Sequence, residues 1–180
     1  MLTLNLNKNM TRVPEVFFHC REVGPSDDYD WVHKSTDYLF GGKRVVVFAL
    51  PGAFTPTCST KQLPGYEDKY DQFKEAGIDE VYCLSVNDAF VMNAWFKSEG
   101  ITNVKPLPDG SGEFTYAMGM SVNKANLGFG FRSWRYAMIV NDGEIEMMFE
   151  EPGKVGNCPT DPYEMSDPDT VLNWLRTGVK

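Results

Sequence analysis

The chain has 180 residues, and 17 Lys and Arg against 25 Asp and Glu leave a formal charge of −8 at neutral pH. This length predicts a single domain over residues 1–180, and an apolar content of 42% supplies a core and excludes intrinsic disorder. The acidic excess argues against nucleic acid and anionic membrane surfaces as partners. The longest apolar stretch, residues 45–50, is far shorter than the roughly 20 residues that span a bilayer.

The first ten residues alternate Leu with Asn and Thr and lack the basic start and apolar middle of a signal peptide, so we expect a cytoplasmic protein. The four cysteines fit a reducing compartment, because they are too few for a disulfide scaffold and form no CxxC pair. His19 and His33 are the only histidines, which leaves few candidates for a Cys/His dyad.

The first strong element is a strand over residues 44–50, bounded by Gly41-Gly42 before it and by Pro51-Gly52 after it. Its continuous apolar run is typical of a strand that is covered on both faces. A helix follows Pro56, with an interruption expected at Pro64-Gly65 and an end at Gly77. Its apolar positions recur at helical spacing: Tyr66, Tyr70, Phe73 and Ala76.

A second apolar strand is predicted over residues 81–86, and Asn87 is expected to cap the helix that follows. This helix would present one apolar face before ending at Gly100, formed by Phe90, Val91, Ala94 and Trp95. Strand, helix, strand and helix in this order imply two parallel strands with a right-handed crossover.

The order then changes. We expect a turn over residues 109–112, a short helical segment around Phe114 and Met118, and a glycine-rich loop over 128–131. Two strands follow, over residues 134–140 and 144–150. These strands flank Asn141-Asp142-Gly143, a strong hairpin signal. A last helix is expected with Ser166 as its N-cap and Val171, Leu172, Trp174 and Leu175 as apolar positions. The plan is α/β, a thioredoxin-like fold with a central mixed sheet flanked by helices.

Cys58 stands just beyond the first strand and in the opening turn of the first helix, whose start Pro56 marks. Backbone N–H groups there have no partners in the helix and favour an anion. Helix N-termini and neighbouring arginines lower the pKa of a thiol. The position therefore suits a reactive thiolate, although a small residue buried at a strand end fits it equally.

Residues 51–58 contain the pattern PxxxTxxC, formed by Pro51, Thr55 and Cys58, and here the sequence resembles the type II peroxiredoxins. This class includes the peroxiredoxin half of some bacterial peroxiredoxin–glutaredoxin fusions. Five further segments resemble the class at its spacing: 63–66 (LPGY), 85–92 (SVNDAFVM), 108–110 (PDG), 127–130 (LGFG) and 132–138 (RSWRYAM). The resemblance covers roughly residues 12 to 176 and implies N-terminal additions to the thioredoxin-like fold.

The resemblance implies a cysteine peroxidase that reduces hydrogen peroxide and organic hydroperoxides through a Cys58 sulfenic acid. Thr55 would hold the peroxide oxygen, Arg135 would pair with thiolate and peroxide, and Pro51 would shield the sulfur from water. Arg135 is chosen over Arg132 because it directly precedes the apolar strand. No metal, haem or flavin is implied. Phe54 and Phe129, with Phe131 and Trp134, could line an approach for alkyl hydroperoxides or contribute to a homodimer face.

Two cysteines are candidates for the thiol that resolves the sulfenic acid. Cys83 lies in the second strand, at a position that resembles the resolving cysteine of plant and bacterial type II enzymes. Bridging it to Cys58 would require local unwinding, because disulfide formation needs Cα atoms within about 7 Å. Cys158 lies in a turn-rich segment near the resolving position of the animal enzymes, one residue out of register. Cys20 matches no motif, and packing explains it best.

The chain is expected to end at its C-terminal helix with no glutaredoxin appended, so electrons would come from glutathione and glutaredoxin or from thioredoxin. A redox-sensing or chaperone-like binding module, in which Cys58 oxidation switches a partner surface, is the alternative. A general thiol–disulfide oxidoreductase ranks last, because such enzymes use the CxxC pair that this sequence lacks. The sequence names neither the reductant, the preferred peroxide nor the resolving thiol.

Overall fold

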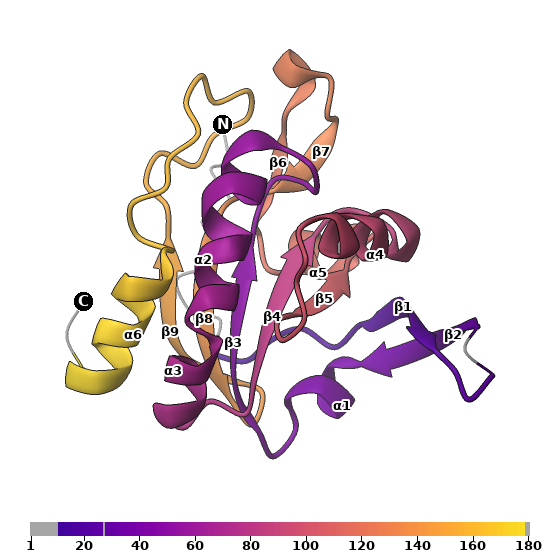
Figure 1. Cartoon of the computed structure of the whole chain (residues 1–180). Helices are drawn as coiled ribbons and strands as arrows, with labels where there is room; N and C mark the ends of the chain where they lie inside the picture. The colour runs from indigo at the N-terminus through magenta and orange to yellow at the C-terminus, as the bar shows by residue number, and fades with distance from the viewer. Residues whose placement is uncertain (1–10, 27, 179–180) are drawn as a thin grey trace.

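The computed structural model describes residues 11–26 and 28–178, and a mixed five-stranded sheet lies at its centre (Figure 1). Residues 1–10, over which no signal peptide is expected, lie outside the described residues. The strand order is β5-β4-β3-β8-β9, with β3, β4 and β5 parallel and β8 and β9 antiparallel. The strands are β3 (Arg44–Ala49), β4 (Glu80–Ser85), β5 (Lys105–Pro108), β8 (Tyr136–Asn141) and β9 (Glu144–Glu150). This arrangement confirms the thioredoxin-like prediction.

Side-chain alternation along β3 divides the core between the two faces of the sheet. Val46 and Phe48 pack beneath four helices, whereas Val45 and Val47 point to the opposite face. The four helices are α2 (Leu63–Asp68), α3 (Tyr70–Glu75), α4 (Ala89–Ser98) and α6 (Pro168–Thr177). The opposite face is covered by α1 (Thr36–Phe40) and α5 (Glu113–Ala117). Both faces of the sheet are therefore buried, as its continuous apolar strands predicted.

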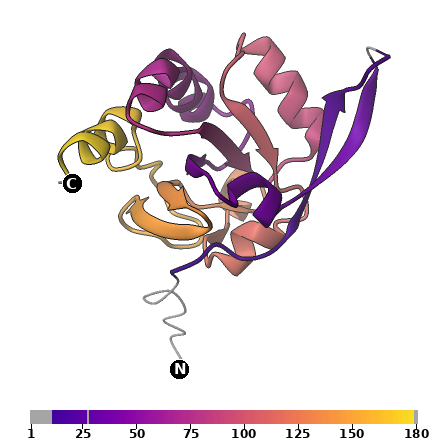
Figure 2. The same cartoon turned by 90° about the horizontal axis from the view of Figure 1, so that it is seen from below.

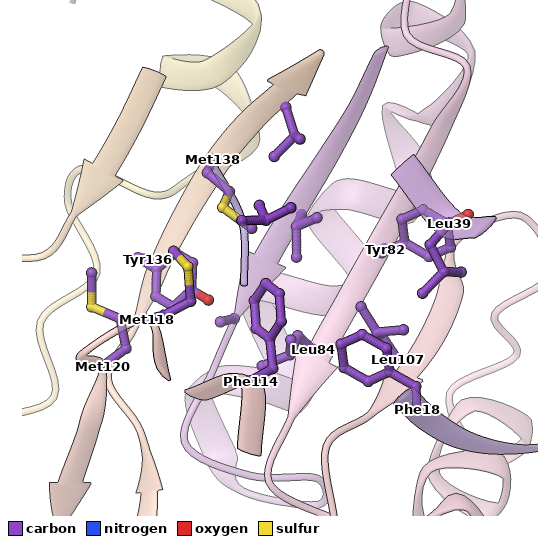
Figure 3. Close-up of a cluster of buried hydrophobic side chains, with 14 of the residues drawn as sticks. Phe18, Leu39, Tyr82, Leu84, Leu107, Phe114, Met118, Met120, Tyr136 and Met138 are labelled. Atoms are coloured by element: carbon purple, nitrogen blue, oxygen red, sulfur yellow. The ribbon is translucent and has the colours of Figure 1, made fainter. Parts of the chain in front are cut away.

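The cluster on the α1 and α5 face is drawn in Figure 3, where side chains from distant parts of the sequence converge on the sheet. The rings of Phe18 and Phe114 lie 5.4 Å apart, so the N-terminal segment contributes to this core. The labelled members are Phe18, Leu39, Tyr82, Leu84, Leu107, Phe114, Met118, Met120, Tyr136 and Met138.

An N-terminal hairpin of β1 (Phe17–Val23) and β2 (Tyr29–Ser35) extends away from the rest of the molecule (Figures 1 and 2). It and α1 are the additions that the resemblance implied. The residue pattern did not reveal them, because β1 buries only Phe18 and Cys20 while Phe17 and Val23 are exposed.

Strand β5 also escaped the sequence analysis, since two of its four residues are prolines. It pairs with β4 alone at the edge of the sheet, where a strand tolerates missing N–H donors. Two shorter strands, β6 (Ser121–Asn123) and β7 (Phe131–Ser133), form a separate ribbon, with the 3₁₀ turn η2 (Ala125–Leu127) between them.

Both predicted helix N-caps are wrong by one residue. Asp88 caps α4 by accepting the N–H of Val91, and Asp167 caps α6 by accepting the N–H of Thr170. Asp follows each predicted cap directly and can accept the same bond. The Asn87 side chain is used elsewhere, as described below.

The buried face of α4 also differs from the prediction. Trp95 is buried and Val91 half-buried as predicted, but Phe90 and Ala94 are exposed, and the helix also buries Ala89, Met92 and Phe96.

The segment after Pro56 does not break at Pro64-Gly65. A π-helical turn, η1 (Cys58–Gln62), runs directly into α2, and Pro64 lies in the first turn of α2, where its missing N–H is tolerated. The interruption falls at Lys69, whose φ of −105° separates α2 from α3.

The hairpin predicted around Asn141-Asp142-Gly143 is confirmed. Asp142 and Gly143 have φ values of 49° and 78°, as a type I′ turn requires. The strand before it begins at Tyr136 rather than at residue 134. Among the described residues, no helix is both long and apolar enough to cross a membrane.

Candidate active site

Cys58 is the first residue of η1 and lies beyond the carboxyl end of β3, as the sequence predicted. The residue is 1% exposed and belongs to the apolar cluster beneath the four helices. The next residue fixes this turn, because Trp95 in α4 donates its Nε1–H to Ser59 Oγ at 2.9 Å. The thiol is therefore held by a short, anchored turn below the surface.

The loop before Cys58 is held from the neighbouring strand by Asn87. Its Oδ1 accepts the backbone N–H of Ala53 at 3.0 Å and the hydroxyl of Ser85 at 2.6 Å. The loop reverses at Phe54, whose φ of 62° is left-handed and uncommon for a residue other than glycine. The Asn87 side chain thus serves the Cys58 loop rather than α4.

Thr55 follows this reversal. Its hydroxyl donates to the carbonyl of Gly52 at 2.7 Å, and its own carbonyl accepts the N–H of Ser59 at 3.0 Å. The hydroxyl oxygen keeps lone pairs and its loop position is fixed. Pro51 is buried at the start of the same loop.

Arg135 reaches the thiol from the strand on the other side of β3. Its Nη1 lies 3.6 Å from Cys58 Sγ and also donates to Gln62 Oε1, while Nη2 forms a 2.6 Å ion pair with Asp161. The guanidinium carbon lies 5.6 Å from the ring centre of Tyr163. Burial lowers the pKa of Arg135, but the charges of Cys58 and Asp161 outweigh it, so the pKa is raised and the cation is held.

A second cation, Arg132, joins the two loops that border the site. It donates from Nε to the carbonyl of Phe129 at 3.1 Å and from Nη1 to the carbonyl of Pro51 at 3.2 Å. A Cβ on Gly52 would lie 2.6 Å from this Nη1, so a larger residue there would displace the Arg132 guanidinium. Burial lowers the pKa of Arg132, and the nearby Cys58 opposes this shift.

The loop that carries Asp161 is tied to Glu151, which directly follows β9 and donates its backbone N–H to the carbonyl of Arg135 at 3.2 Å. The buried carboxylate of Glu151 accepts the backbone N–H groups of Glu164, Met165 and Ser166, and also the Ser166 hydroxyl, at 2.8–3.0 Å. Ser166, expected as a helix cap, therefore donates hydrogen bonds to this carboxylate instead. The arrangement fixes the loop whose Asp161 meets Arg135.

The two candidate resolving cysteines lie in different environments. Cys83 is fully buried in the same apolar cluster as Cys58, and burial raises its pKa well above that of an ordinary thiol. Cys158 is 9% exposed and belongs to the opposite cluster; a hydrogen bond with Thr160 lowers its pKa, with a smaller contribution from Lys124.

Cys20 lies on β1, and burial raises its pKa to about 11, in agreement with a packing role. The adjacent His19 forms a hydrogen bond with His33, Nδ1 to Nδ1 at 2.6 Å, rather than with this thiol. All four cysteines are free.

A pocket of about 330 Å³, here called the Lys124 pocket, opens beside the thiol loop. It connects Thr55 and Pro51 with Cys158 and Asp161. Phe129 lines it, whereas Phe54 is 56% exposed and does not. The full lining is Pro51, Thr55, Pro56, Lys124, Asn126, Leu127, Phe129, Cys158, Pro159, Thr160 and Asp161.

The structure brings Cys58 and Arg135 into contact and places Thr55 and Pro51 on the loop that leads into the Cys58 turn, and it adds two residues that the sequence analysis missed. Gln62 lies four residues after Cys58, so helical spacing could have indicated it. Asp161 had no local signal, since a loop far along the chain delivers it. No group of three His, Cys, Asp or Glu side chains among the described residues could hold a metal ion.

Comparisons with known proteins agree with this geometry. The redoxin family model matches residues 30–165. A peroxiredoxin of Rhizobium etli is 57% identical over 169 residues, which cover 92% of this chain and 94% of that protein. A hybrid peroxiredoxin of Haemophilus influenzae is 50% identical over 91% of this chain and 64% of its own length.

Among solved structures, the chain is similar to a Plasmodium falciparum antioxidant protein described as a 1-Cys peroxiredoxin, with a TM-score of 0.89. The two are 38% identical, and the match covers 93% of this chain and 99% of that one. The structure has a buried thiol beyond the end of a thioredoxin-like strand and an arginine in contact with that thiol. Together with these relatives, this shows that the chain belongs to the peroxiredoxins, a family of thiol-dependent peroxidases.

Proposed function

We propose that Cys58 is the peroxidatic thiol of this peroxiredoxin and that residues 1–180 form its single catalytic domain. The observation that carries the assignment is the contact between Arg135 Nη1 and Cys58 Sγ at 3.6 Å. A buried guanidinium stabilises a thiolate, which is the nucleophilic form of cysteine. At Cys20 and Cys83, by contrast, burial dominates and raises the pKa of the thiol, and Lys34 offsets this only in part at Cys20.

Gln62 and Asp161 position this arginine. One anchors Nη1 and the other Nη2, so the planar guanidinium is fixed at both ends and keeps one edge on the sulfur. A preorganised donor is effective in catalysis because it does not have to reorient during the reaction. Gln62 and Asp161 are therefore positioning residues.

Thr55 and Pro51 complete the proposed peroxide site. The Thr55 hydroxyl is oriented by the Gly52 carbonyl, and Thr55 lines the Lys124 pocket, which supports its role in binding a peroxide oxygen. Pro51 is buried beside it and excludes water from the sulfur. Phe129 supplies an apolar wall for the substrate, a role that the exposed Phe54 does not share.

The reaction follows from these groups. The Cys58 thiolate attacks one oxygen of the hydroperoxide, the S–O bond forms as the O–O bond breaks, and the departing oxygen leaves as water or an alcohol after taking a proton. Cys58 is oxidised to the sulfenic acid while the peroxide is reduced. Arg135 and Thr55 stabilise the charge that moves onto the departing oxygen.

The sulfenic acid is returned to a thiol by a second sulfur, and both internal candidates stay open. Cys83 shares the apolar cluster of Cys58 but is fully buried, so its attack requires the Cys58 turn to unwind. Cys158 lines the Lys124 pocket together with Thr55, which supports direct access. An external thiol, from glutathione and glutaredoxin or from thioredoxin, closes the cycle in either case.

The proposal places the enzyme in the cytoplasm, a reducing compartment, which the four free cysteines support. We also propose a homodimer. Exposed apolar side chains around the site support it, because apolar surface gathered in one region favours contact with a partner. They are Phe54, Tyr116, Leu127 and Phe131, each at least 55% exposed.

Mass spectrometry of protein treated with one equivalent of hydrogen peroxide tests these assignments. We expect Cys58 as the oxidised residue, either as sulfenic acid or in a disulfide with Cys83 or Cys158. Oxidation of another cysteine while Cys58 stays reduced would refute the proposal. Repeated turnover on addition of glutathione and glutaredoxin, or of thioredoxin, identifies the reductant and separates an enzyme from a sensor that is oxidised once.

A further inference from the structure

Lys124 is the feature of the Lys124 pocket that the proposed peroxidase cycle does not use. The residue is only 4% exposed, yet its side chain lines the pocket. Within residues 11–26 and 28–178 its ammonium has neither a hydrogen bond nor an ion pair, and its recorded contact is with the Trp134 ring, at 5.7 Å. No carboxylate among the described residues pairs with this ammonium, and its charge acts instead on the Cys158 thiol, whose pKa it helps to lower.

The other charged side chain in the pocket does not balance it. Asp161 points its carboxylate at Arg135, with which it forms a 2.6 Å ion pair. Apolar groups make up most of the remaining wall: Pro51, Pro56, Leu127, Phe129 and Pro159. The pocket therefore combines an ammonium that pairs with no carboxylate of the described residues and a largely apolar lining, and it opens beside the proposed peroxide site.

The lysine is held in place by its backbone. Lys124 donates its N–H to Gly130 at 2.7 Å and accepts the N–H groups of Leu127 at 3.0 Å and Phe129 at 3.2 Å. These bonds fix the backbone of Lys124, and burial of its side chain against the Trp134 ring restricts the ammonium, which lowers the entropy lost when a ligand binds.

We propose that the Lys124 pocket binds organic hydroperoxides that carry a carboxylate, with the carboxylate on the Lys124 ammonium and the peroxide directed to Cys58. The proposal rests on the proposed function of Cys58. A volume of about 330 Å³ lies within the range of roughly 300–1,000 Å³ for small-molecule sites. An apolar body with one anionic end matches the walls, whereas glutathione would bring a second carboxylate and an ammonium that the apolar groups leave unpartnered.

The chemistry of the bound substrate is that of the proposed cycle. The thiolate of Cys58 takes the terminal oxygen, the O–O bond breaks, and the alkoxide leaves as the alcohol after protonation. The carboxylate is unchanged and serves only for binding. One sulfur is oxidised by two electrons and one peroxide is reduced by two.

Three probes test the proposal: 4-(2-hydroperoxypropan-2-yl)benzoate, its methyl ester and cumene hydroperoxide. Because the carboxylate would form a charged hydrogen bond with the Lys124 ammonium that the ester cannot form, we expect kcat/KM for the acid to exceed that for the ester by about tenfold. This preference would oppose the net charge of −8, which repels anions in general. The wild-type ratio alone is decisive: an acid reduced no faster than its ester overturns the proposal.

Variants locate the preference. Lys124→Met should bring the ratio of acid to ester to about one, and Lys124→Arg should retain most of it. Because the ratio is taken within each variant, a general loss of activity cancels. Lys97→Met is the matched control, since Lys97 is exposed on α4 outside the pocket, and it should keep the wild-type ratio. A ratio that survives in Lys124→Met also overturns the proposal.

The alcohol product 4-(2-hydroxypropan-2-yl)benzoate tests binding to the pocket separately from the choice between peroxide substrates. It should inhibit hydrogen peroxide reduction competitively in wild type and about tenfold less in Lys124→Met. A change only in the KM for glutathione would assign the pocket to the reductant and refute our proposal. Failure of the wild type to reduce any of the peroxides would instead refute the function proposed for Cys58.

Discussion

Cys58 and Cys83 lie in one apolar cluster, 1% and 0% exposed, yet their surroundings differ in kind. Cys58 contacts the guanidinium of Arg135. Cys83 is opposed in the sheet by Phe48 and Pro106, and burial raises its pKa well above the ordinary value. Burial alone therefore does not define a reactive thiol; the charge that meets the sulfur does.

Removing the sulfur of Cys58 tests the difference between Cys58 and Cys83 most strongly. Cys58→Ser should lower the rate of hydrogen peroxide consumption by about a thousandfold or more, because a hydroxyl is far less ionised than a thiol. Peroxide loss in the presence of reductant is the measurement. Cys83→Ala is the matched variant, and in a single turnover it should oxidise Cys58 at the wild-type rate. A slow first step in Cys83→Ala would show that both thiols take part in it.

Removing the charge and keeping the sulfur is the second test. Arg135→Lys should lower kcat/KM for hydrogen peroxide by about a hundredfold, since a lysine cannot meet Gln62, Asp161 and the sulfur together. Steady-state kinetics provide the measurement, and Arg12→Lys on the exposed surface is the control. Wild-type kinetics in Arg135→Lys would mean that charge without the guanidinium geometry is sufficient.

The pH dependence of resolution distinguishes the two internal candidates. Because the thiolate attacks, a thiol with a raised pKa is mostly protonated at neutral pH and its rate climbs about tenfold per pH unit. Cys83 should behave in this way. The lowered pKa of Cys158 predicts a rate that levels off below the ordinary thiol pKa. Stopped-flow measurement of disulfide formation between pH 6 and 9 would separate them, with Cys158→Ala as the reference.

A stability variant far from both sulfurs gives the smallest effect. Burial raises the pKa of Glu67, but hydrogen bonds from Val104, Thr102 and Asn103 outweigh it, so the pKa is lowered in the folded protein. Stability from this carboxylate is therefore present above the unfolded pKa of about 4.3 and is lost as the pH falls through the lower folded value.

Glu67→Gln should accordingly lower the free energy of unfolding by about 1 kcal/mol at pH 7, and the difference should vanish at strongly acidic pH. Urea denaturation at several pH values measures it. The variant should consume peroxide like wild type, so a large loss of activity would show that frame stability, rather than the environment of the sulfur, governs the rate.

The central part of this site could be predicted because local pattern determines it. Short segments of the sequence are sufficient to identify the buried strand, the PxxxTxxC pattern and the arginine that precedes a later apolar strand. The structure brings Cys58 and Arg135 together. Asp161 could not be foreseen, because its position depends on a loop that Glu151 fixes through backbone N–H groups. Lys124 is similar: a lysine in a glycine-rich segment is expected on the surface, and only the fold buries it.

The N-terminal hairpin and β5 were missed for a related reason. β1 buries two of its seven side chains, and β5 contains two prolines, so neither shows the apolar alternation of a sheet strand. β5 is placed by its pairing with β4 at the sheet edge, and β1 is anchored by the contact of Phe18 with Phe114, which are long-range contacts that a local pattern does not show.

The π-helical turn at Cys58 has a mechanical consequence. In it the carbonyl of Cys58 is bonded to the N–H of Leu63, five residues on, a wider and less favourable spacing than in an α-helix. Because this bonding is less favourable, we expect the turn to unwind more readily than α2 beyond it. Unwinding of these five residues, which hold the sulfur against Arg135, would let an oxidised Cys58 move toward a second thiol without unfolding the domain.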